Sequence, residues 1–417
     1  MAEFRGRFGH DELRPGQAPL MHSVLEGRDA VGVLPTGGGK SACYQLPAIL
    51  LEGTALVVCP LIALMKDQVD SLKRRGIPAE AYHSGLLSNE RERIIDAFKG
   101  GHLKLLYLAP EQLARGEFTS LIQKGGLSFL AVDEAHCISQ WGHDFRPDYR
   151  RLGELRAGRG LDKLPILAVT ATATPQVRGD IARQLALREP LEIVTGFRRG
   201  NLAFEVTHSN GDLEKMRALS RLLTDTRRDG GATVVYVSTR KAAESLAAHY
   251  DHPTVAYYHA GLDARERANR QEAFLGGKLS MLIATNAFGM GIDKPDVRLV
   301  VHYHLPASLE AYYQEGGRAG RDGLPARCVL LFDHADIQLQ KYFINRHPDQ
   351  ARESLKRRLG ILAEMVAYST SSICRQRYIL KYFGDPESGL FSACGRCDTC
   401  LRPGKKWIRK LSLVLRS

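Results

Sequence analysis

The chain has 417 residues, more than one hydrophobic core usually holds, so its length predicts two or three domains. With 44% hydrophobic and 25% charged residues it has the composition of a globular protein, and its apolar runs are too short to span a membrane. The first residues lack the apolar stretch of a secretory signal, so we expect a cytosolic protein. The formal net charge of +12 favours a polyanionic partner.

Short runs of aliphatic and β-branched residues alternate with helix-like stretches along the chain. The first five runs cover residues 30–34, 55–59, 103–108, 129–132 and 166–170. The same rhythm restarts with residues 233–237, 254–258, 281–284, 299–302 and 328–332. Continuous apolar runs of this kind predict strands of a parallel sheet that helices cover on both faces. The sequence therefore predicts an α/β protein with two tandem parallel-sheet lobes.

Glycine and asparagine residues between positions 195 and 212 interrupt both patterns and predict a linker between the lobes. After residue 336 the strand-like runs stop and helical spacing takes over, which predicts a small third module. The expected parts are a first lobe at residues 1–205, a second lobe at 206–335, a helical module at 336–405 and a basic tail at 406–417. A solvated surface segment is the alternative reading of that tail.

A glycine-rich segment begins at Leu34-Pro35, directly after the first predicted strand, and leads into a predicted helix. In this setting the main-chain N–H groups of glycines can close around phosphates, while Lys40 supplies positive charge and Ser41 a magnesium ligand. The strict phosphate-loop pattern has glycine at position 34, so a simple glycine-rich turn is the alternative for this segment. The predicted nucleotide contacts are Thr36, Gly37, Gly38, Gly39, Lys40 and Ser41.

An acidic pair, Asp133 and Glu134, stands at the end of the predicted strand 129–132. Two carboxylates at the carboxyl end of a strand can divide the work of hydrolysis: Asp133 holds magnesium, and Glu134 orients and deprotonates the attacking water. Together with the phosphate loop, this pair predicts an NTPase. His136 follows at once, and it is either a hydrogen-bonded core residue or a link from the site to neighbouring elements.

A second glycine-rich segment, residues 314–323, closes the second predicted lobe and contains Gln314, Arg318 and Arg321. Phosphoryl transfer needs positive charge as negative charge moves onto the leaving group, and an arginine from another lobe supplies it only when the lobes close. We therefore predict catalytic roles for the two arginines and a nucleotide contact for Gln314. The alternative is a surface turn with two solvated arginines.

The eight cysteines fall into two groups. Four have apolar neighbours, as core thiols do: Cys43, Cys59, Cys137 and Cys328. The other four are clustered near the end of the chain: Cys374, Cys394, Cys397 and Cys400. Four such thiolates suit a tetrahedral structural zinc ion. An iron–sulfur cluster is the main alternative, although the Cys-Pro that follows in ferredoxins is absent, and disulfides are a further one.

Residues 139–149 directly follow the acidic pair and include Trp141, Phe145, Arg146 and Tyr149. Flat rings beside an arginine can stack on nucleic-acid bases without reading their sequence. Ordinary core packing is the alternative for these aromatic side chains. We predict that this loop senses a bound strand and couples it to hydrolysis.

These motifs, in this order, resemble those of RecQ-family DNA helicases over residues 8–403. The resemblance is carried by residues 13–17, 35–41, 60–68, 133–136, 139–149, 170–173, 284–293 and 314–323. The aromatic-rich loop is found in this family rather than in helicases generally. The resemblance implies two RecA-like lobes, an ATP-dependent motor that moves 3′ to 5′ on single-stranded DNA and unwinds duplexes, and a role in repair, recombination or replication. Its implied cofactors are ATP, Mg²⁺ and Zn²⁺.

The resemblance also implies roles for single residues. Arg14 and Gln17 would recognise adenine, with Phe8 or a neighbour stacking on it. Arg321 would be the arginine finger and Arg318 a second phosphate contact. The residues implied in DNA binding or its coupling to ATP are Lys66, Trp141, Phe145, Arg146, Thr172, Thr239, Arg240, His259 and Thr285. We expect a monomer in the bacterial cytoplasm, associated with the nucleoid, that binds single-stranded and duplex DNA and no membrane.

The chain departs from the family pattern at two places. Arg199-Gly200-Asn201 stands where Arg-Pro-Asn is common, which bears on the stiffness of the linker, and Leu13 stands where phenylalanine is common. RecQ proteins commonly continue into a winged-helix domain, for which the residues after Cys400 are too few, so we expect weak affinity for duplex DNA. The alternatives to a DNA helicase are an RNA helicase and a DNA-binding switch that uses ATP without unwinding.

Overall fold

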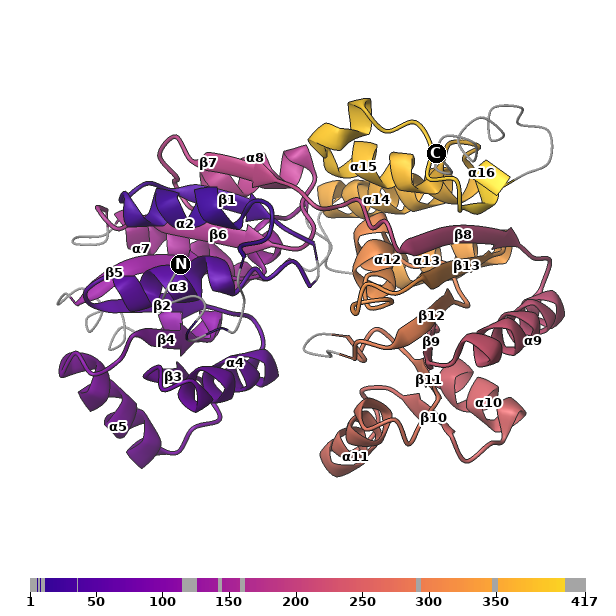
Figure 1. The fold of residues 1–417 in the computed structure, drawn as a ribbon, viewed down its shortest axis with the longest axis horizontal. Helices are drawn as coiled ribbons and strands as arrows, with labels where there is room; N and C mark the ends of the chain where they lie inside the picture. The colour runs from indigo at the N-terminus through magenta and orange to yellow at the C-terminus, as the bar shows by residue number, and fades with distance from the viewer. Residues whose placement is uncertain are drawn as a thin grey trace. The chain divides into compact units, whose positions relative to one another are not determined.

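The protein divides into two compact units, seen here in a computed structural model (Figure 1). The first unit is Met1–Phe197 with Phe383–Asp385, and the second is Arg198–Tyr382 with Pro386–Ser417. The residues described are 6, 8, 12–35, 37–114, 126–141, 145–157, 162–289, 294–346 and 352–401. Within these ranges, no helix is long and apolar enough to cross a membrane.

The first unit is built on a seven-stranded parallel sheet with the order β3-β4-β2-β5-β6-β1-β7. Its strands are β1 Ala30–Val33, β2 Thr54–Val58, β3 Ala79–Tyr82, β4 Leu105–Leu108, β5 Leu127–Val132, β6 Ile166–Thr170 and β7 Leu191–Val194. Its α-helices are α2 Gln17–Leu25, α3 Ala42–Leu50, α4 Ile62–Arg74, α5 Ser88–Lys99, α7 Arg151–Ala157 and α8 Pro175–Gln184. Three short 3₁₀ turns are η1 Pro110–Ala114, η2 Ala135–Ile138 and η3 Pro147–Arg150.

The second unit is built on a six-stranded parallel sheet with the order β10-β11-β9-β12-β13-β8. Its strands are β8 Leu202–His208, β9 Ala232–Tyr236, β10 Val255–Tyr258, β11 Met281–Ala284, β12 Val297–His302 and β13 Ala326–Phe332. Its helices are α9 Asp212–Asp229, α10 Arg240–Tyr250, α11 Ala264–Leu275, α12 Leu309–Gly316, α13 His334–Asn345, α14 Arg352–Thr370, α15 Arg375–Phe383, η4 Pro386–Gly389 and α16 Asp398–Leu401. These two parallel sheets confirm the predicted two-lobed α/β fold.

Sheet topology explains why motifs far apart in sequence meet in the first unit. Strands β5, β6 and β1 are neighbours, and all run in the same direction. The loops that leave their carboxyl ends therefore lie at one edge of the sheet, where ligands bind in open α/β folds. These loops are the glycine-rich segment after β1, the acidic pair after β5 and the Thr170-Ala171-Thr172 turn after β6.

The division between the units differs from the expected boundary at residue 205, because residues 202–208 form β8 rather than a linker. This strand pairs with β13 along its whole length, from Leu202 opposite Ala326 to His208 opposite Phe332. The chain passes from one unit to the other between Phe197 and Arg198. The polar Glu205 interrupts the apolar pattern at this sheet edge, which is why the strand is not recognisable as a continuous apolar run.

Apart from Phe383–Asp385, the helical module after β13 belongs to the same unit as the second lobe. Helix α14 packs against α13 and α12, and α16 packs against β8 (Figure 1). Aromatic contacts continue this interface, since the Tyr312 and Tyr368 ring centroids lie 5.3 Å apart and the Tyr382 hydroxyl donates to Glu310 Oε1 at 2.7 Å. The four clustered cysteines therefore lie in a module that packs directly against the second lobe.

Candidate nucleotide, nucleic-acid and zinc sites

The glycine-rich segment forms the loop between β1 and α3, as a phosphate-binding loop requires. Gly37 and Gly39 have φ angles of +78° and +74°, in the left-handed region that favours glycine. A Cβ on Gly38 would lie 2.8 Å from the Pro35 carbonyl oxygen, so that position also demands glycine. Helix α3 begins at Ala42, which places Lys40 and Ser41 at its N-terminus. Thr36, the remaining predicted contact, lies outside the described residues.

Arg14 and Gln17 contact the phosphate loop directly. Gln17 Nε2 donates to the Gly39 carbonyl at 2.9 Å and to the Gly38 carbonyl at 3.3 Å, and the Arg14 guanidinium donates to the Gly37 carbonyl. The two side chains are also joined, because the Arg14 main-chain N–H donates to Gln17 Oε1 at 2.8 Å. Phe8 lies in the apolar core of this unit, 8% exposed, with the Arg75 guanidinium over its ring. Its stacking on adenine stays a prediction.

A buried tyrosine joins the helix after the phosphate loop to Asp133. The Tyr44 hydroxyl donates to Asp133 Oδ2 at 3.0 Å, and the Tyr44 main-chain N–H donates to the Ser41 carbonyl at 3.2 Å in the first turn of α3. Burial, and then the adjacent Glu134, raise the pKa of the Asp133 carboxyl to about 6, whereas the charge of Lys40 lowers it. A divalent cation held by Asp133 and Ser41 would satisfy this desolvated carboxylate, so the donor set fits Mg²⁺.

Glu134 is held in an unusual conformation beside Asp133. Its φ of 48° lies in the left-handed region, which a non-glycine residue adopts only where the surroundings impose it. Its N–H donates to Asp133 Oδ1 at 2.8 Å, and its Oε2 lies 3.3 Å from His136 Nδ1. This backbone strain occurs where a water-orienting carboxylate would have to be positioned accurately.

His136 links the acidic pair to the turn after β6. Its Nδ1 lies 2.8 Å from Thr170 Oγ1, which in turn accepts from the Thr172 N–H at 3.3 Å. The ring is 3% exposed, so both interpretations of this histidine apply: it is a hydrogen-bonded core residue that also connects the site to a neighbouring element. Within the described chain, the buried Thr172 hydroxyl has no hydrogen-bond partner of its own.

The described residues of the aromatic-rich loop are tied to the acidic pair and to the end of β2. The Tyr149 hydroxyl, fully buried, donates to the Asp133 carbonyl at 3.2 Å. Arg146 donates from its main chain to the Cys137 carbonyl at 2.8 Å and from Nη1 to the Pro60 carbonyl at 2.9 Å. Trp141 is 38% exposed. The loop therefore has one exposed ring, Trp141, and is held by hydrogen bonds to Pro60 and to Asp133.

In the second unit, the arginine segment follows α12 and is buried in part. Arg318 is 6% exposed, and its Nε has no hydrogen-bond partner in the described part of the unit. Glu315, one turn earlier, has its Oε2 2.8 Å from Nε2 of the His302 ring, from which the carboxylate accepts a hydrogen bond when that nitrogen carries the proton. An orphaned guanidinium nitrogen at this position fits an oxyanion such as a phosphate. Gln314 and Arg321 are both partly buried on the same segment.

The remaining residues predicted to bind DNA fall into exposed and buried sets. Lys66 on α4 and Arg240 at the start of α10 are exposed. Thr239 is the N-cap of α10 and accepts from the Ala242 N–H at 3.1 Å. His259 is 4% exposed, 2.9 Å from Glu244 Oε1, and Thr285 is 9% exposed at the end of β11. The buried members can act on DNA only through their neighbours.

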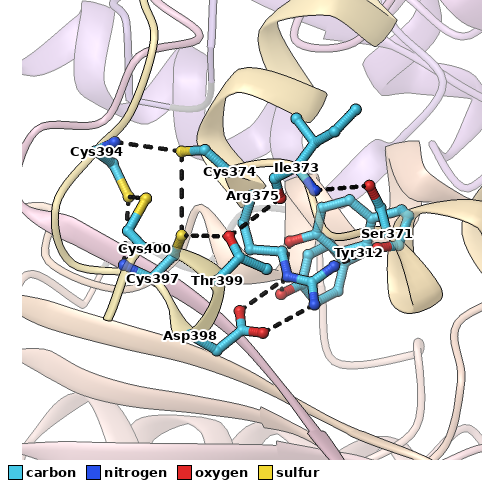
Figure 2. Close-up of polar contacts among 11 residues, drawn as sticks. Tyr312, Ser371, Ile373, Cys374, Arg375, Cys394, Cys397, Asp398, Thr399 and Cys400 are labelled. Atoms are coloured by element: carbon cyan, nitrogen blue, oxygen red, sulfur yellow. Dashed lines mark hydrogen bonds and ion pairs between the residues drawn. The ribbon is translucent and has the colours of Figure 1, made fainter. Parts of the chain in front are cut away.

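The four clustered cysteines converge on one point, as Figure 2 shows. Their Sγ atoms all lie within 4.8 Å of one another, with separations of 4.0 Å for Cys374–Cys397 and 3.9 Å for Cys394–Cys400. A tetrahedral zinc ion with Zn–S bonds of about 2.3 Å requires sulfurs roughly 3.8 Å apart, so the geometry fits zinc. Main-chain N–H groups of Cys394 and Cys397 donate to Sγ of the preceding ligand.

The cluster is supported by an outer set of polar contacts (Figure 2). Arg375, fully buried, makes a bidentate pair with Asp398 at 2.8 Å for each bond. The Thr399 hydroxyl lies 3.1 Å from Cys397 Sγ and donates to the Ile373 carbonyl at 3.1 Å. Such outer partners orient the ligands of a metal site. The other four thiols are buried and separate, as expected of core residues.

Some residues of these sites were not identified from the sequence. Tyr44 hydrogen-bonds to Asp133, yet a tyrosine in a helix carries no local signal of such a role, and Tyr149 was noted only as one of the aromatic residues of its loop. Arg199 and Asn201, which contact the arginine segment, were noted only as part of a linker. A signal for them existed, because two side chains with several hydrogen-bonding groups flank a glycine just before a strand.

Two parallel-sheet lobes, with a phosphate loop and an acidic pair in the first and an arginine segment in the second, are features of the helicase class of proteins. Residues 14–180 match the DEAD/DEAH box helicase family, residues 214–323 the helicase conserved C-terminal domain, and residues 334–401 the RecQ zinc-binding domain. The probable ATP-dependent DNA helicase RecS of Bacillus subtilis is 41% identical over 350 residues, which cover 83% of this chain and 69% of that protein. The chain belongs to the RecQ family of helicases.

Other similarities agree with this assignment. The ATP-dependent DNA helicase RecQ of Bacillus subtilis is 43% identical over 398 residues, or 94% of this chain. The chain spans 65% of the length of that relative. Among solved structures, the DUF1998 helicase MrfA bound to DNA and AMPPNP aligns over 94% of this chain and 57% of that chain, with a TM-score of 0.66 and 21% identity. That last similarity concerns the fold.

Proposed function

We propose that the protein is an ATP-dependent DNA helicase that translocates 3′ to 5′ along single-stranded DNA and unwinds duplexes. The observation that carries the ATP-dependent part is the hydrogen bond from the Tyr44 hydroxyl to Asp133, which joins the acidic pair to the helix that begins directly after Lys40 and Ser41. Relatives named as ATP-dependent DNA helicases support the choice of DNA.

In the proposed cycle, the residues divide binding and hydrolysis between them. Arg14 and Gln17 recognise the base and sense the phosphate loop through its carbonyls. Lys40 binds phosphate, Ser41 and Asp133 hold Mg²⁺, and Glu134 orients and deprotonates water. Arg318 and Arg321, supplied by the second unit, neutralise the charge that develops on the leaving group. Zinc held by the four cysteines has a structural role.

We also propose a cellular compartment and a DNA substrate for the protein. Buried free thiols in both lobes favour a reducing compartment, so we place the protein in the cytoplasm with chromosomal DNA, acting as a monomer in repair, recombination or replication. The decisive experiment measures ATP hydrolysis with single-stranded DNA and with RNA oligomers of the same sequence. Strand displacement on duplexes with a single 3′ or 5′ tail then tests the motor and its direction together.

The alternatives give different results in these assays. An RNA helicase would show hydrolysis that RNA stimulates more than DNA does. A DNA-binding switch would hydrolyse ATP, or change its DNA affinity with ATP, without displacing a strand from either tail. Stimulation by DNA together with displacement only from a 3′ tail is the result we expect. The intact Lys40, Glu134 and Arg321 favour the motor over the switch.

The aromatic-rich loop supports a prediction about the coupling of DNA binding to ATP hydrolysis. Trp141→Ala or Arg146→Ala should leave ATP affinity nearly unchanged, but both should abolish stimulation of hydrolysis by single-stranded DNA and suppress unwinding, as should Phe145→Ala. The physical reason is that Arg146 and Tyr149 connect this loop to Pro60 and to Asp133, next to the catalytic carboxylate. The measurement is ATP hydrolysis with and without DNA, together with strand displacement.

A matched control for the exposed ring is Tyr342→Ala. Tyr342 on α13 is 54% exposed and belongs to the other unit. It should keep normal stimulation and unwinding. If the Trp141, Phe145 and Arg146 variants behaved like this control, the loop would have only a packing role.

A further inference from the structure

The segment Arg199-Gly200-Asn201, at the start of the second unit, is hydrogen-bonded to the arginine segment at residues 314–323. We call the side chains of Arg199 and Asn201 the clamp. Arg199 Nη2 donates to the Ala319 carbonyl at 3.0 Å and to the Gly320 carbonyl at 3.4 Å, and its Nη1 donates to the Gly317 carbonyl at 3.3 Å. One guanidinium thus holds three carbonyls that flank Arg318 and directly precede Arg321. Desolvation lowers the pKa of Arg199, as expected for a guanidinium enclosed by this backbone.

Asn201 completes the clamp from the other side of Gly200. Its Nδ2 donates to the Gly320 carbonyl at 2.7 Å and to the Leu324 carbonyl at 2.9 Å, and its own carbonyl accepts from the Ala326 N–H at 3.0 Å. Gly320 has a φ of +60°, and a Cβ there would lie 2.5 Å from Asn201 Nδ2. The close approach of Asn201 therefore requires glycine between the two arginines.

Arg396 connects the cysteine cluster to this clamp. Arg396 lies between Cys394 and Cys397, and its Nη1 donates to the Gly200 carbonyl, between the two clamp residues. A second contact also joins the cysteine cluster to this segment. Helix α16, which carries Cys400, packs against β8, and β8 begins directly after Asn201. All of these residues belong to the second unit.

We propose that Arg199 and Asn201 are positioning residues for the catalytic arginine segment, and that the cysteine cluster holds them in place through Arg396. The inference rests on the proposed function of Arg318 and Arg321. A carbonyl clamp fixes the backbone from which both guanidinium groups extend, and a displacement of about 1 Å in such a group can reduce a rate by roughly 100-fold. Metal binding at the cysteines is thereby linked to the rate of hydrolysis.

The test separates turnover from nucleotide binding in the full chain. Arg199→Ala should lower the DNA-stimulated kcat for ATP hydrolysis by about 100-fold, whereas the Kd for a fluorescent ATP analogue should change less than about threefold, because the phosphate loop belongs to the other unit. Arg199→Lys should rescue only in part, since a single ammonium lacks the guanidinium fork. Arg396→Ala should lower kcat by about tenfold with zinc content unchanged.

Coupling between these residues provides a sharper measurement. The double variant Arg199→Ala/Arg396→Ala should have a kcat within about twofold of Arg199→Ala alone, because Arg396 acts through the clamp. Multiplicative losses would overturn the proposed path. Arg396 is exposed, so its variant keeps the test valid even if Arg199→Ala does not fold. Arg358→Ala, an exposed arginine on α14 of the same unit, is the matched control and should keep wild-type kcat.

Arg321→Ala, measured in parallel, distinguishes the two levels of inference. Wild-type hydrolysis in this variant would refute the catalytic role of the arginine segment itself. Loss of hydrolysis in Arg321→Ala combined with wild-type kcat in Arg199→Ala, Asn201→Ala and Arg396→Ala would refute the clamp alone. A fall in zinc content of Arg396→Ala in step with its kcat would assign the effect to the metal site instead of the tether.

Discussion

Replacing Glu134 with glutamine should reduce ATP turnover by about 10²–10⁴-fold while ATP remains bound, because an amide cannot take the proton of the attacking water. Lys40→Ala should fail at an earlier step. Losing one charge-assisted contact to phosphate costs about 1.5–3 kcal/mol, which weakens ATP affinity roughly tenfold or more. Both variants should stay folded, since Lys40 is partly exposed and a glutamine side chain has the same shape as the native Glu134.

The two variants are separated by measuring the Kd for a fluorescent ATP analogue and the rate of phosphate release. Glu26→Gln is a matched control, because Glu26 is an exposed carboxylate of the same unit that pairs only with Arg28 in the described structure. It should retain both affinity and rate. Near-native hydrolysis by Glu134→Gln would show that another group activates water.

The sequence predicted the strands of the sheet interiors well, and the three that it missed share a position. All ten predicted runs became strands, with ends shifted by at most two residues or so. The missed strands β3, β7 and β8 all lie at sheet edges. Each is interrupted by a glutamate that an edge strand can expose: Glu80, Glu192 and Glu205. A search for continuous apolar runs finds strands buried on both faces and passes over these edges.

The site could be predicted as a set of motifs but not as a network. The residue types at positions 37–41, 133–134 and 374–400 carry chemistry that their spacing reveals, and the structure brings each set together. The connections between sets depend on contacts between distant parts of the chain. Tyr44 lies 89 residues from Asp133, and Arg199 lies about 120 residues from the carbonyls that it holds. No local pattern encodes a pairing over such separations.

The linker shows the same limitation from another side. Glycine and asparagine near residue 200 predict a break between the two patterns. Their physical role differs from that of a flexible connection, because Asn201 and Arg199 make fixed hydrogen bonds and Gly200 offers its carbonyl to Arg396. The departure from Arg-Pro-Asn at position 200 therefore leaves both neighbouring side chains anchored, and the concern about stiffness applies only to the backbone of Gly200.

Replacing Cys397 with serine should remove zinc and unfold the helical module, while ATP binding persists. Structural zinc sites in small peptides contribute about 10–16 kcal/mol of apparent binding free energy at pH 7, comparable to the whole stability of a typical domain. Cys397 is fully buried, and its Sγ lies near both Cys374 Sγ and the Thr399 hydroxyl, so a serine oxygen would be a poor and misplaced ligand. Replacing Cys374, Cys394 or Cys400 with serine should give the same result.

The measurements are metal content by mass spectrometry, proteolysis of residues 352–401, and affinity for the ATP analogue. Cys328→Ala is the matched control: its thiol is buried in β13 of the same unit, away from the cluster, and the variant should retain one equivalent of zinc. Wild-type protein that contains iron, or that is folded with no metal, would refute zinc as the ion. A Cys397→Ser variant that keeps a protease-resistant module would show that packing of α14 on α12 and of α16 on β8 stabilises this region without metal.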